Sequence, residues 1–64
     1  MKITLNGEPR DIAADRLAPA LAELGYDGTV ATALNGDFVP AALREGQALR
    51  EGDRVEVLAP RQGG

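Results

Sequence analysis

The sequence contains no cysteine, no histidine and no tryptophan, and only one phenylalanine and one tyrosine. Without cysteine and histidine the chain forms no disulfide, carries no persulfide on a thiol, and has no zinc or haem ligation of the common kinds. Nucleophilic catalysis by a Ser/His or Cys/His pair is excluded for the same reason. With so few aromatic residues, the core must consist of Leu, Val, Ile and Ala, which bury less area per side chain.

Long apolar runs and an excess of positive charge are also lacking. Apolar stretches such as residues 20–22 are far shorter than the roughly 20 residues that a membrane-spanning helix needs. Ten acidic residues against seven basic ones give a net charge of -3, which is the wrong sign for binding a phosphate backbone. We therefore expect neither a membrane nor a nucleic acid as partner. No signal-peptide pattern precedes the first predicted strand, so a cytoplasmic location is expected.

A chain of 64 residues is sufficient for one small domain and too short for a multi-domain enzyme. The acidic residues are scattered among predicted turns and strand exteriors, a pattern typical of a solvated surface. Nothing in the sequence supplies a nucleophile with a base, a metal-ligand cluster or a phosphate-binding loop. We expect no catalytic residue, no metal site and no bound cofactor.

Alternating apolar and polar residues indicate several short β-strands. The predicted strands span residues 1–5, 8–12, 30–34, 38–39 and 54–58. Asn6-Gly7 and Asn35-Gly36 predict two-residue hairpin turns of type I′, in which both residues have positive φ. Pro9 has no backbone donor, so its strand is predicted at a sheet edge.

One segment has helical spacing instead. Its apolar residues at i, i+3, i+4 and i+7 are Leu17, Ala20, Leu21 and Leu24. Because Pro19 is tolerated only in a first turn and restrains the residue before it, the helix is predicted to start at Ala18 or Pro19. Gly25 is suited to the left-handed residue that ends a helix.

The order of these elements predicts an α+β fold in which a mixed sheet of four to five strands wraps one face of a short helix. The first and last strands are expected to be central parallel neighbours. Residues 41–49 are predicted to be irregular, with room for one helical turn. Leu43 and Leu49 within this segment are expected to fill the core.

The chain is predicted to divide into a domain, residues 1–59, and a flexible tail, residues 60–64, that ends in Gly63-Gly64. Glycine has no Cβ, so an extended Gly-Gly segment passes through a channel too narrow for other residues and delivers its α-carboxylate to a partner's active site. Five residues reach roughly 16 Å at about 3.3 Å each. A frayed end or an expression-vector remnant is the other interpretation of this ending.

A carboxylate is a poor electrophile until it is activated, for example with ATP to an acyl-adenylate. Transfer of sulfur to the adenylate yields a terminal thiocarboxylate, a sulfur nucleophile on a mobile arm. A chain without cysteine would carry sulfide in this way.

Several segments together are more specific than the ending alone. They are the opening strand with Asn6-Gly7, the Leu17/Leu21/Leu24 helix, Leu34 to Pro40 (LNGDFVP), Leu49 to Val57 (LREGDRVEV) and Gln62-Gly63-Gly64. In these segments and in length, the chain resembles the small ThiS-type sulfur carriers of thiamine biosynthesis, which have the β-grasp or ubiquitin-like fold. Two departures are Ala41, where many members have Arg after Val-Pro, and Pro19 at the helix start. Both bear on partner affinity more than on the chemistry of the tail.

The resemblance implies that Gly64 is adenylated by an E1-like adenylyltransferase, which uses the ATP. Sulfur mobilised by a cysteine desulfurase then converts the adenylate to a thiocarboxylate, which thiazole synthase uses to form the thiazole of thiamine. Arg61, Gln62 and Gly63 would occupy the channel of the partner enzyme. Arg61 is expected either to pair with an acidic or phosphate group there or to remain solvated.

Partners are predicted to dock on the sheet face opposite the helix. Alternation places Ala31, Ala33 and Leu58 on that face, with Leu58 next to the tail. The alternative is that Leu58 is an ordinary exposed leucine, as many monomers carry. The free chain is expected to be a monomer.

Three other functions remain open. The small subunit of molybdopterin synthase has the same chemistry and ending, although its chain is usually longer. A ubiquitin-like modifier would be joined through Gly64 to a lysine of its target. A regulatory or scaffolding β-grasp module would need no free terminus.

Overall fold

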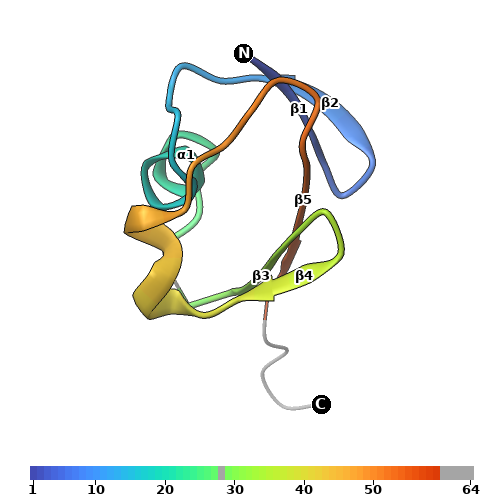
Figure 1. Cartoon of the computed structure of the whole chain (residues 1–64). Coiled ribbons are helices and arrows are strands. Elements are labelled where there is room, and N and C mark those ends of the chain that lie inside the picture. Colours follow the sequence, from blue (N-terminus) through green and yellow to red (C-terminus); the bar gives the residue numbers. More distant parts are fainter. Residues whose placement is uncertain (28, 60–64) are drawn as a thin grey trace.

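The computed structural model describes residues 1–27 and 29–59. In this part of the chain a five-stranded mixed sheet curls around one α-helix (Figure 1). The elements in chain order are β1 (Lys2–Leu5), β2 (Glu8–Asp11), α1 (Leu17–Glu23), β3 (Ala31–Leu34), β4 (Asp37–Val39), the 3₁₀ helix η1 (Ala41–Gly46) and β5 (Arg54–Leu58). This is the predicted order of strands and α-helix, and the strand ends differ from the prediction by at most one residue.

The strands lie in the order β2-β1-β5-β3-β4. β1 and β5 are parallel, with Leu5 opposite Val55, and the other neighbouring pairs are antiparallel. The first and last strands are therefore central parallel neighbours, as the sequence predicted. β2, which contains Pro9, lies at a sheet edge, where a missing backbone donor is tolerated.

Both Asn-Gly turns have the predicted geometry. Asn6 and Gly7 have φ of 50° and 87°, and Asn35 and Gly36 have φ of 51° and 89°. Positive φ at both central residues is the mark of a type I′ turn, whose twist matches that of the strands it joins. Each turn thus fixes the register of its hairpin.

The helix starts earlier than predicted. α1 begins at Leu17, whose backbone N–H donates to the carbonyl of Gln47 at 2.9 Å. The prediction of a start at Ala18 or Pro19 is wrong because this long-range hydrogen bond, which the local sequence does not contain, orders the first residue. Pro19 is then the third helical residue, where no intrahelical donor is lost. Gly25, with φ of 94°, follows the helix end as expected.

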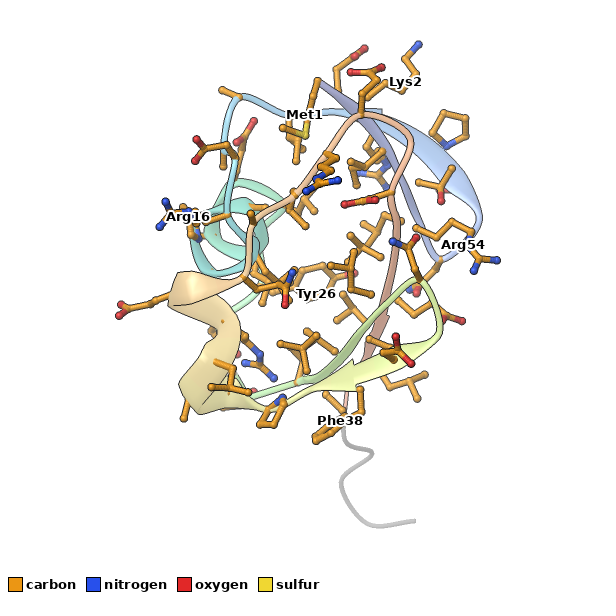
Figure 2. The ribbon with its side chains drawn as sticks, in the orientation of Figure 1. Met1, Lys2, Arg16, Tyr26, Phe38 and Arg54 are labelled. Atoms are coloured by element: carbon orange, nitrogen blue, oxygen red, sulfur yellow. The ribbon has the colours of Figure 1, made fainter. Side chains whose placement is uncertain are left out.

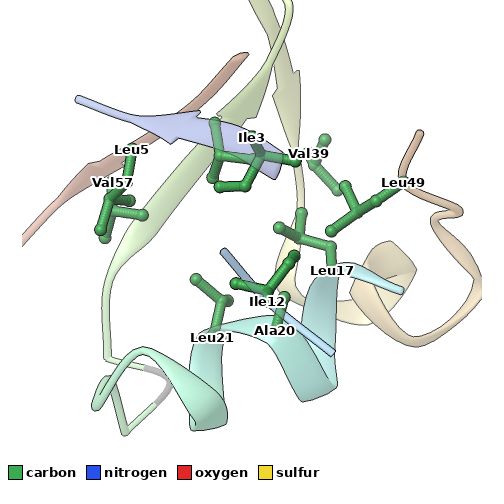
Figure 3. Packing of buried hydrophobic residues seen from close by; sticks show 10 residues of the cluster. Ile3, Leu5, Ile12, Leu17, Ala20, Leu21, Val39, Leu49 and Val57 are labelled. Carbon is green, nitrogen blue, oxygen red and sulfur yellow. The ribbon is translucent and has the colours of Figure 1, made fainter. Parts of the chain in front are cut away.

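The core lies between the concave face of the sheet and α1 (Figure 3). Its buried apolar residues are Ile3, Leu5, Ile12, Leu17, Ala20, Leu21, Val39, Leu49, Val55 and Val57. Ile3 and Leu17 have no exposed surface. All ten are aliphatic, as the shortage of aromatic residues required.

Leu49 is in the core, but Leu43 is not, and the prediction for Leu43 is wrong. Leu43 is 60% exposed, and the buried residue of η1 is Arg44. A 3₁₀ helix turns once every three residues, so one residue per turn faces inward. Arg44 takes that position because its guanidinium reaches Thr32 and the carbonyl of Val30.

Candidate functional site

An apolar area lies on the convex face of the sheet, away from α1. In the pairing register Ala31 is opposite Leu58, and Ala33 lies between Phe38 and Glu56. Successive side chains of a strand point to opposite faces, so these residues face outward while Thr32, Val39 and Val57 are buried beneath them. We call this surface the outer-face patch; it consists of Ala31, Ala33, Phe38 and Leu58.

The two large side chains of the outer-face patch are strongly exposed. Leu58 is 73% exposed and Phe38 is 68% exposed. They flank β3, which contributes only the methyl groups of Ala31 and Ala33 between them. A partner side chain can therefore approach the backbone of β3 between Phe38 and Leu58. Burial of these two side chains against the partner would be favourable.

The patch lies where β5 ends. Leu58 is the last residue of β5, and Figure 2 shows Phe38 at the same end of the sheet. Ala59 is the last described residue. The predicted tail residues, Arg61, Gln62, Gly63 and Gly64, lie outside the described residues.

Ala31, Ala33 and Leu58 lie on the face where the sequence placed them, and their role in docking stays a prediction. Phe38 was missed in the sequence analysis. A two-residue hairpin turn at Asn35-Gly36 pairs residue 34 with residue 37, and hence Ala33 with Phe38. That register was a sufficient signal to place Phe38 on the outer face.

The end of β5 is held by a side chain from the first hairpin turn. The backbone N–H of Val57 donates to Oδ1 of Asn6 at 2.8 Å, and Nδ2 of Asn6 donates to the carbonyl of Val57 at 3.1 Å. The backbone N–H of Asn6 also donates to the carbonyl of Val55 at 2.9 Å. Asn6 thus bonds to β5 with both its backbone and its side chain.

The second Asn-Gly turn binds the start of the same strand. The backbone N–H of Arg54 donates to Oδ1 of Asn35 at 2.9 Å, and the N–H of Asn35 donates to the carbonyl of Arg54 at 2.8 Å. Nδ2 of Asn35 donates to the Asp53 carboxylate at 3.1 Å. β5 is therefore fastened at its start by Asn35 and near its end by Asn6.

A groove of about 440 Å³ lies between α1 and η1. Four alanines line it together with Leu21, Tyr26, Asp27, Arg44 and Glu45. This lining holds no nucleophile paired with a base, the arrangement that covalent catalysis requires. Among residues 1–27 and 29–59, no group of three or more carboxylates is placed to hold a metal ion.

One carboxylate at the edge of this groove has a shifted pKa. The backbone N–H of Thr29 donates to Asp27 Oδ1 at 3.0 Å, and the Thr29 hydroxyl donates to the same oxygen at 2.8 Å. These bonds favour the ionised carboxylate and hold the pKa of Asp27 below its ordinary value of 3.8. No helix in the described part of the chain is long and apolar enough to cross a membrane.

Comparison with known proteins gives a consistent result. The model of the ThiS family matches residues 3–64. The sulfur carrier protein ThiS of Thermus thermophilus is 40% identical over 63 residues, which cover 97% of this chain and 98% of that protein.

Two solved structures have the same fold. The crystal structure of the thiamine biosynthesis protein ThiS from Geobacter metallireducens superimposes with a TM-score of 0.82 at 28% identity, covering 100% of both chains. The solution structure of a thiamine biosynthesis protein from the same organism gives a TM-score of 0.80 at 26% identity, covering 100% of this chain and 88% of that one. Family model, sequence relative and β-grasp fold agree over essentially the whole length, and the chain belongs to the ThiS family.

Proposed function

We propose that this chain carries sulfur for thiamine biosynthesis as a thiocarboxylate on Gly64. The observation that carries the proposal is the extent of the family match, which runs through residue 64 and so includes Gly63-Gly64. The relative in Thermus thermophilus is named a sulfur carrier protein. The body of the chain would then serve to present its own terminal carboxylate to other proteins, and it would not itself be an enzyme.

The chemistry needs two displacement steps. A carboxylate oxygen of Gly64 attacks the α-phosphorus of ATP, and pyrophosphate leaves. A sulfur nucleophile at the oxidation level of sulfide then attacks the acyl carbon, and AMP leaves. A C–S bond replaces a C–O bond at the same carbon without a change in its oxidation state. The activating enzyme binds the ATP, so the carrier itself binds no cofactor.

Three partners follow from this sequence of steps. An E1-like adenylyltransferase forms the adenylate, and thiazole synthase takes the thiocarboxylate. A donor linked to a cysteine desulfurase supplies the sulfur as a persulfide, from which two thiols of a reductant release sulfide as they form a disulfide. The outer-face patch supports docking of such partners because it places Phe38 and Leu58 beside the end of β5. Burial of these side chains would bring the channel of each enzyme to the point where residues 60–64 begin.

The direct test is intact-mass analysis of the full chain after incubation with ATP, the E1-like enzyme of the same genome and a sulfur source. The expected product is free protein whose mass has increased by the replacement of one oxygen with sulfur. Conjugates of higher mass in cell extracts would instead indicate a ubiquitin-like modifier. Support of molybdopterin formation, and not of thiazole formation, by the thiocarboxylate would identify the other carrier class.

Two tail variants sharpen this test. Deletion of Gly64 and the substitution Gly63→Val should both abolish adenylation, the first by shortening the arm and the second by adding a side chain that a narrow channel excludes. Neither should shift the melting temperature, because the tail has no apolar anchor in its sequence. Growth without thiamine that depends on a Gly64-deleted chain would contradict the proposal.

A further inference from the structure

We propose that Asn6 is a positioning residue for the reactive tail, because its side chain fixes the place where the chain leaves the sheet. The inference rests on the proposed function of Gly64 and concerns how the fold presents it. Asn6 lies far from Gly64 in the sequence, but its side chain bonds to the residue directly before Leu58.

The Asn6 side chain replaces the backbone groups of a strand residue that β1 lacks. β1 pairs with β5 through Thr4 and Leu5 and then turns away at Asn6-Gly7. If β1 continued parallel to β5, its backbone would offer one acceptor and one donor to Val57, the next residue of β5 that faces it. The carboxamide of Asn6 offers the same pair of groups, and both bond to the backbone of Val57. The ladder is thus extended by one step beyond the end of β1.

This bond pair decides how β5 ends. The N–H and C=O of a strand residue point to the same side, so those of Val57 face Asn6 while those of Glu56 and Leu58 face β3. Without the Asn6 amide, both backbone groups of Val57 lose their partner in the sheet. The last two residues of β5 are then held by their contacts with β3 alone, which weakens the hold on Leu58 in the outer-face patch.

The loss of activity expected without the Asn6 amide depends on the position of Leu58 more than on the length of the arm. While Leu58 is paired with Ala31, the arm to the reactive end consists of the six residues 59–64, and release of Leu58 and Val57 makes it eight. Effective concentration falls with about the −3/2 power of linker length, so this change alone lowers it only about 1.5-fold. Loss of Leu58 from its place beside Ala31 removes a docking contact and displaces the end of β5, from which the tail starts. The displacement of Leu58 therefore matters more than the change in arm length.

Asn35 provides a matched control within the same chain. It occupies the same position of a second type I′ turn, with nearly the same φ, and its side chain also accepts a hydrogen bond from a backbone N–H of β5. Its bond is to Arg54, at the opposite end of the strand. Glycine tolerates positive φ, so Asn6→Gly and Asn35→Gly keep both turns and remove only the amides.

The experiment measures adenylation of the full-length wild type, Asn6→Gly, Asn6→Asp and Asn35→Gly by the E1-like enzyme, as pyrophosphate release over a range of carrier concentrations. Amide hydrogen exchange of Val57 and Leu58 is measured on the same proteins. A partly unfolded carrier acts as diluted substrate, which raises KM and leaves kcat at saturation unchanged. A misplaced tail lowers kcat at saturation, so kcat separates misplacement from partial unfolding and from loss of the Leu58 contact, both of which raise KM.

We expect Asn6→Gly to lower kcat roughly tenfold, the order of loss that misplacement of a reacting group produces. Exchange at Val57 should accelerate roughly tenfold or more, because its hydrogen bond is lost. Asn6→Asp keeps the acceptor for the Val57 N–H, so its kcat should lie between those of the wild type and Asn6→Gly. Asn35→Gly should keep the wild-type kcat.

Other results would overturn the positioning role or the proposed function. An unchanged kcat for Asn6→Gly, or an equal loss for Asn35→Gly, overturns the positioning role while leaving the proposed function intact. Wild-type exchange at Val57 as fast as in Asn6→Gly shows that the amide does not hold the strand. If the E1-like enzyme releases no pyrophosphate from ATP with the wild-type chain as substrate, the proposed function fails and the positioning role fails with it.

Discussion

Nε of Arg44 donates a 3.0 Å hydrogen bond to Oγ1 of Thr32, and both residues are buried. The Thr32 hydroxyl in turn donates to the carbonyl of Val39 at 2.8 Å, and the guanidinium of Arg44 also donates to the carbonyl of Val30. One charged side chain therefore fastens η1 to β3 and, through Thr32, to β4. These bonds offset the cost of burying the guanidinium.

Replacement of Arg44 by methionine should destabilise the fold. Arg44→Met keeps much of the side-chain volume but leaves the carbonyl of Val30 and Oγ1 of Thr32 without this donor. The expected loss is about 1–3 kcal/mol of unfolding free energy, measured by urea denaturation. Arg50→Met, at an exposed arginine, is the control and should change the unfolding free energy by less than about 0.5 kcal/mol. Equal stability of Arg44→Met and wild type would contradict the role assigned to this network.

Polar substitutions in the outer-face patch should weaken docking without unfolding the chain. Phe38→Ser and Leu58→Ser remove the two large apolar contacts, and each should raise KM for the E1-like enzyme about tenfold, since full burial of such a side chain contributes about 1.5–3 kcal/mol. Leu43→Ser is the matched control, because Leu43 is similarly exposed but lies on η1. Steady-state kinetics with all three variants test the patch, and a KM for Leu43→Ser raised as much as the others would show that docking is not specific to the patch.

Truncation of Ile3 should greatly lower the free energy of unfolding of a domain of this size. Ile3 has no exposed surface and lies on β1 among the buried aliphatic residues (Figure 3). Ile3→Ala should cost about 2–5 kcal/mol and Ile3→Val about 0.5–1.5 kcal/mol. Because small single domains have only a few kcal/mol in total, Ile3→Ala should be largely unfolded at 25 °C by circular dichroism. A cooperative transition near the wild-type midpoint would show that the core relaxes around the cavity.

The hydrogen bonds to Asp27 predict a pH dependence of stability. The pKa of Asp27 is lowered by the backbone N–H and then by the hydroxyl of Thr29. A lowered folded-state pKa gives stabilisation that is present above the unfolded-state value of 3.8 and is lost as pH falls through the folded-state value. Thr29→Val removes the hydroxyl alone, so the pKa of Asp27 should rise but stay below 3.8, as an NMR titration would measure. An unchanged titration would mean that the hydroxyl does not bond to the carboxylate in solution.

Local sequence was sufficient wherever a short segment determines its own conformation. The Asn6-Gly7 and Asn35-Gly36 turns were predictable because few residues adopt positive φ readily. The alternation in 54–58 predicted the bounds of β5 and its buried face. The position of Leu58 on the outer face followed from the same alternation.

Predictions failed where a residue distant in sequence decides the outcome. The start of α1 is set by a hydrogen bond from Leu17 to Gln47, thirty positions away. The exposure of Leu43 follows from the bonds that Arg44 makes with β3. Phe38 is a different case, because the adjacent two-residue turn at Asn35-Gly36 pairs it with Ala33 and is a local signal for its place on the outer face.

By itself, then, the sequence determined the elements, the type I′ turns, the aliphatic core and the Gly63-Gly64 ending, because each depends on residue type and local spacing. Only the tertiary structure decided which side chains meet: Asn6 with Val57, Asn35 with Arg54 and Arg44 with Thr32. Such contacts join segments that are separated along the chain. The pairing of β1 and β3 on either side of β5 brings both asparagines within hydrogen-bonding distance of β5, and the packing of η1 against the sheet brings Arg44 to Thr32.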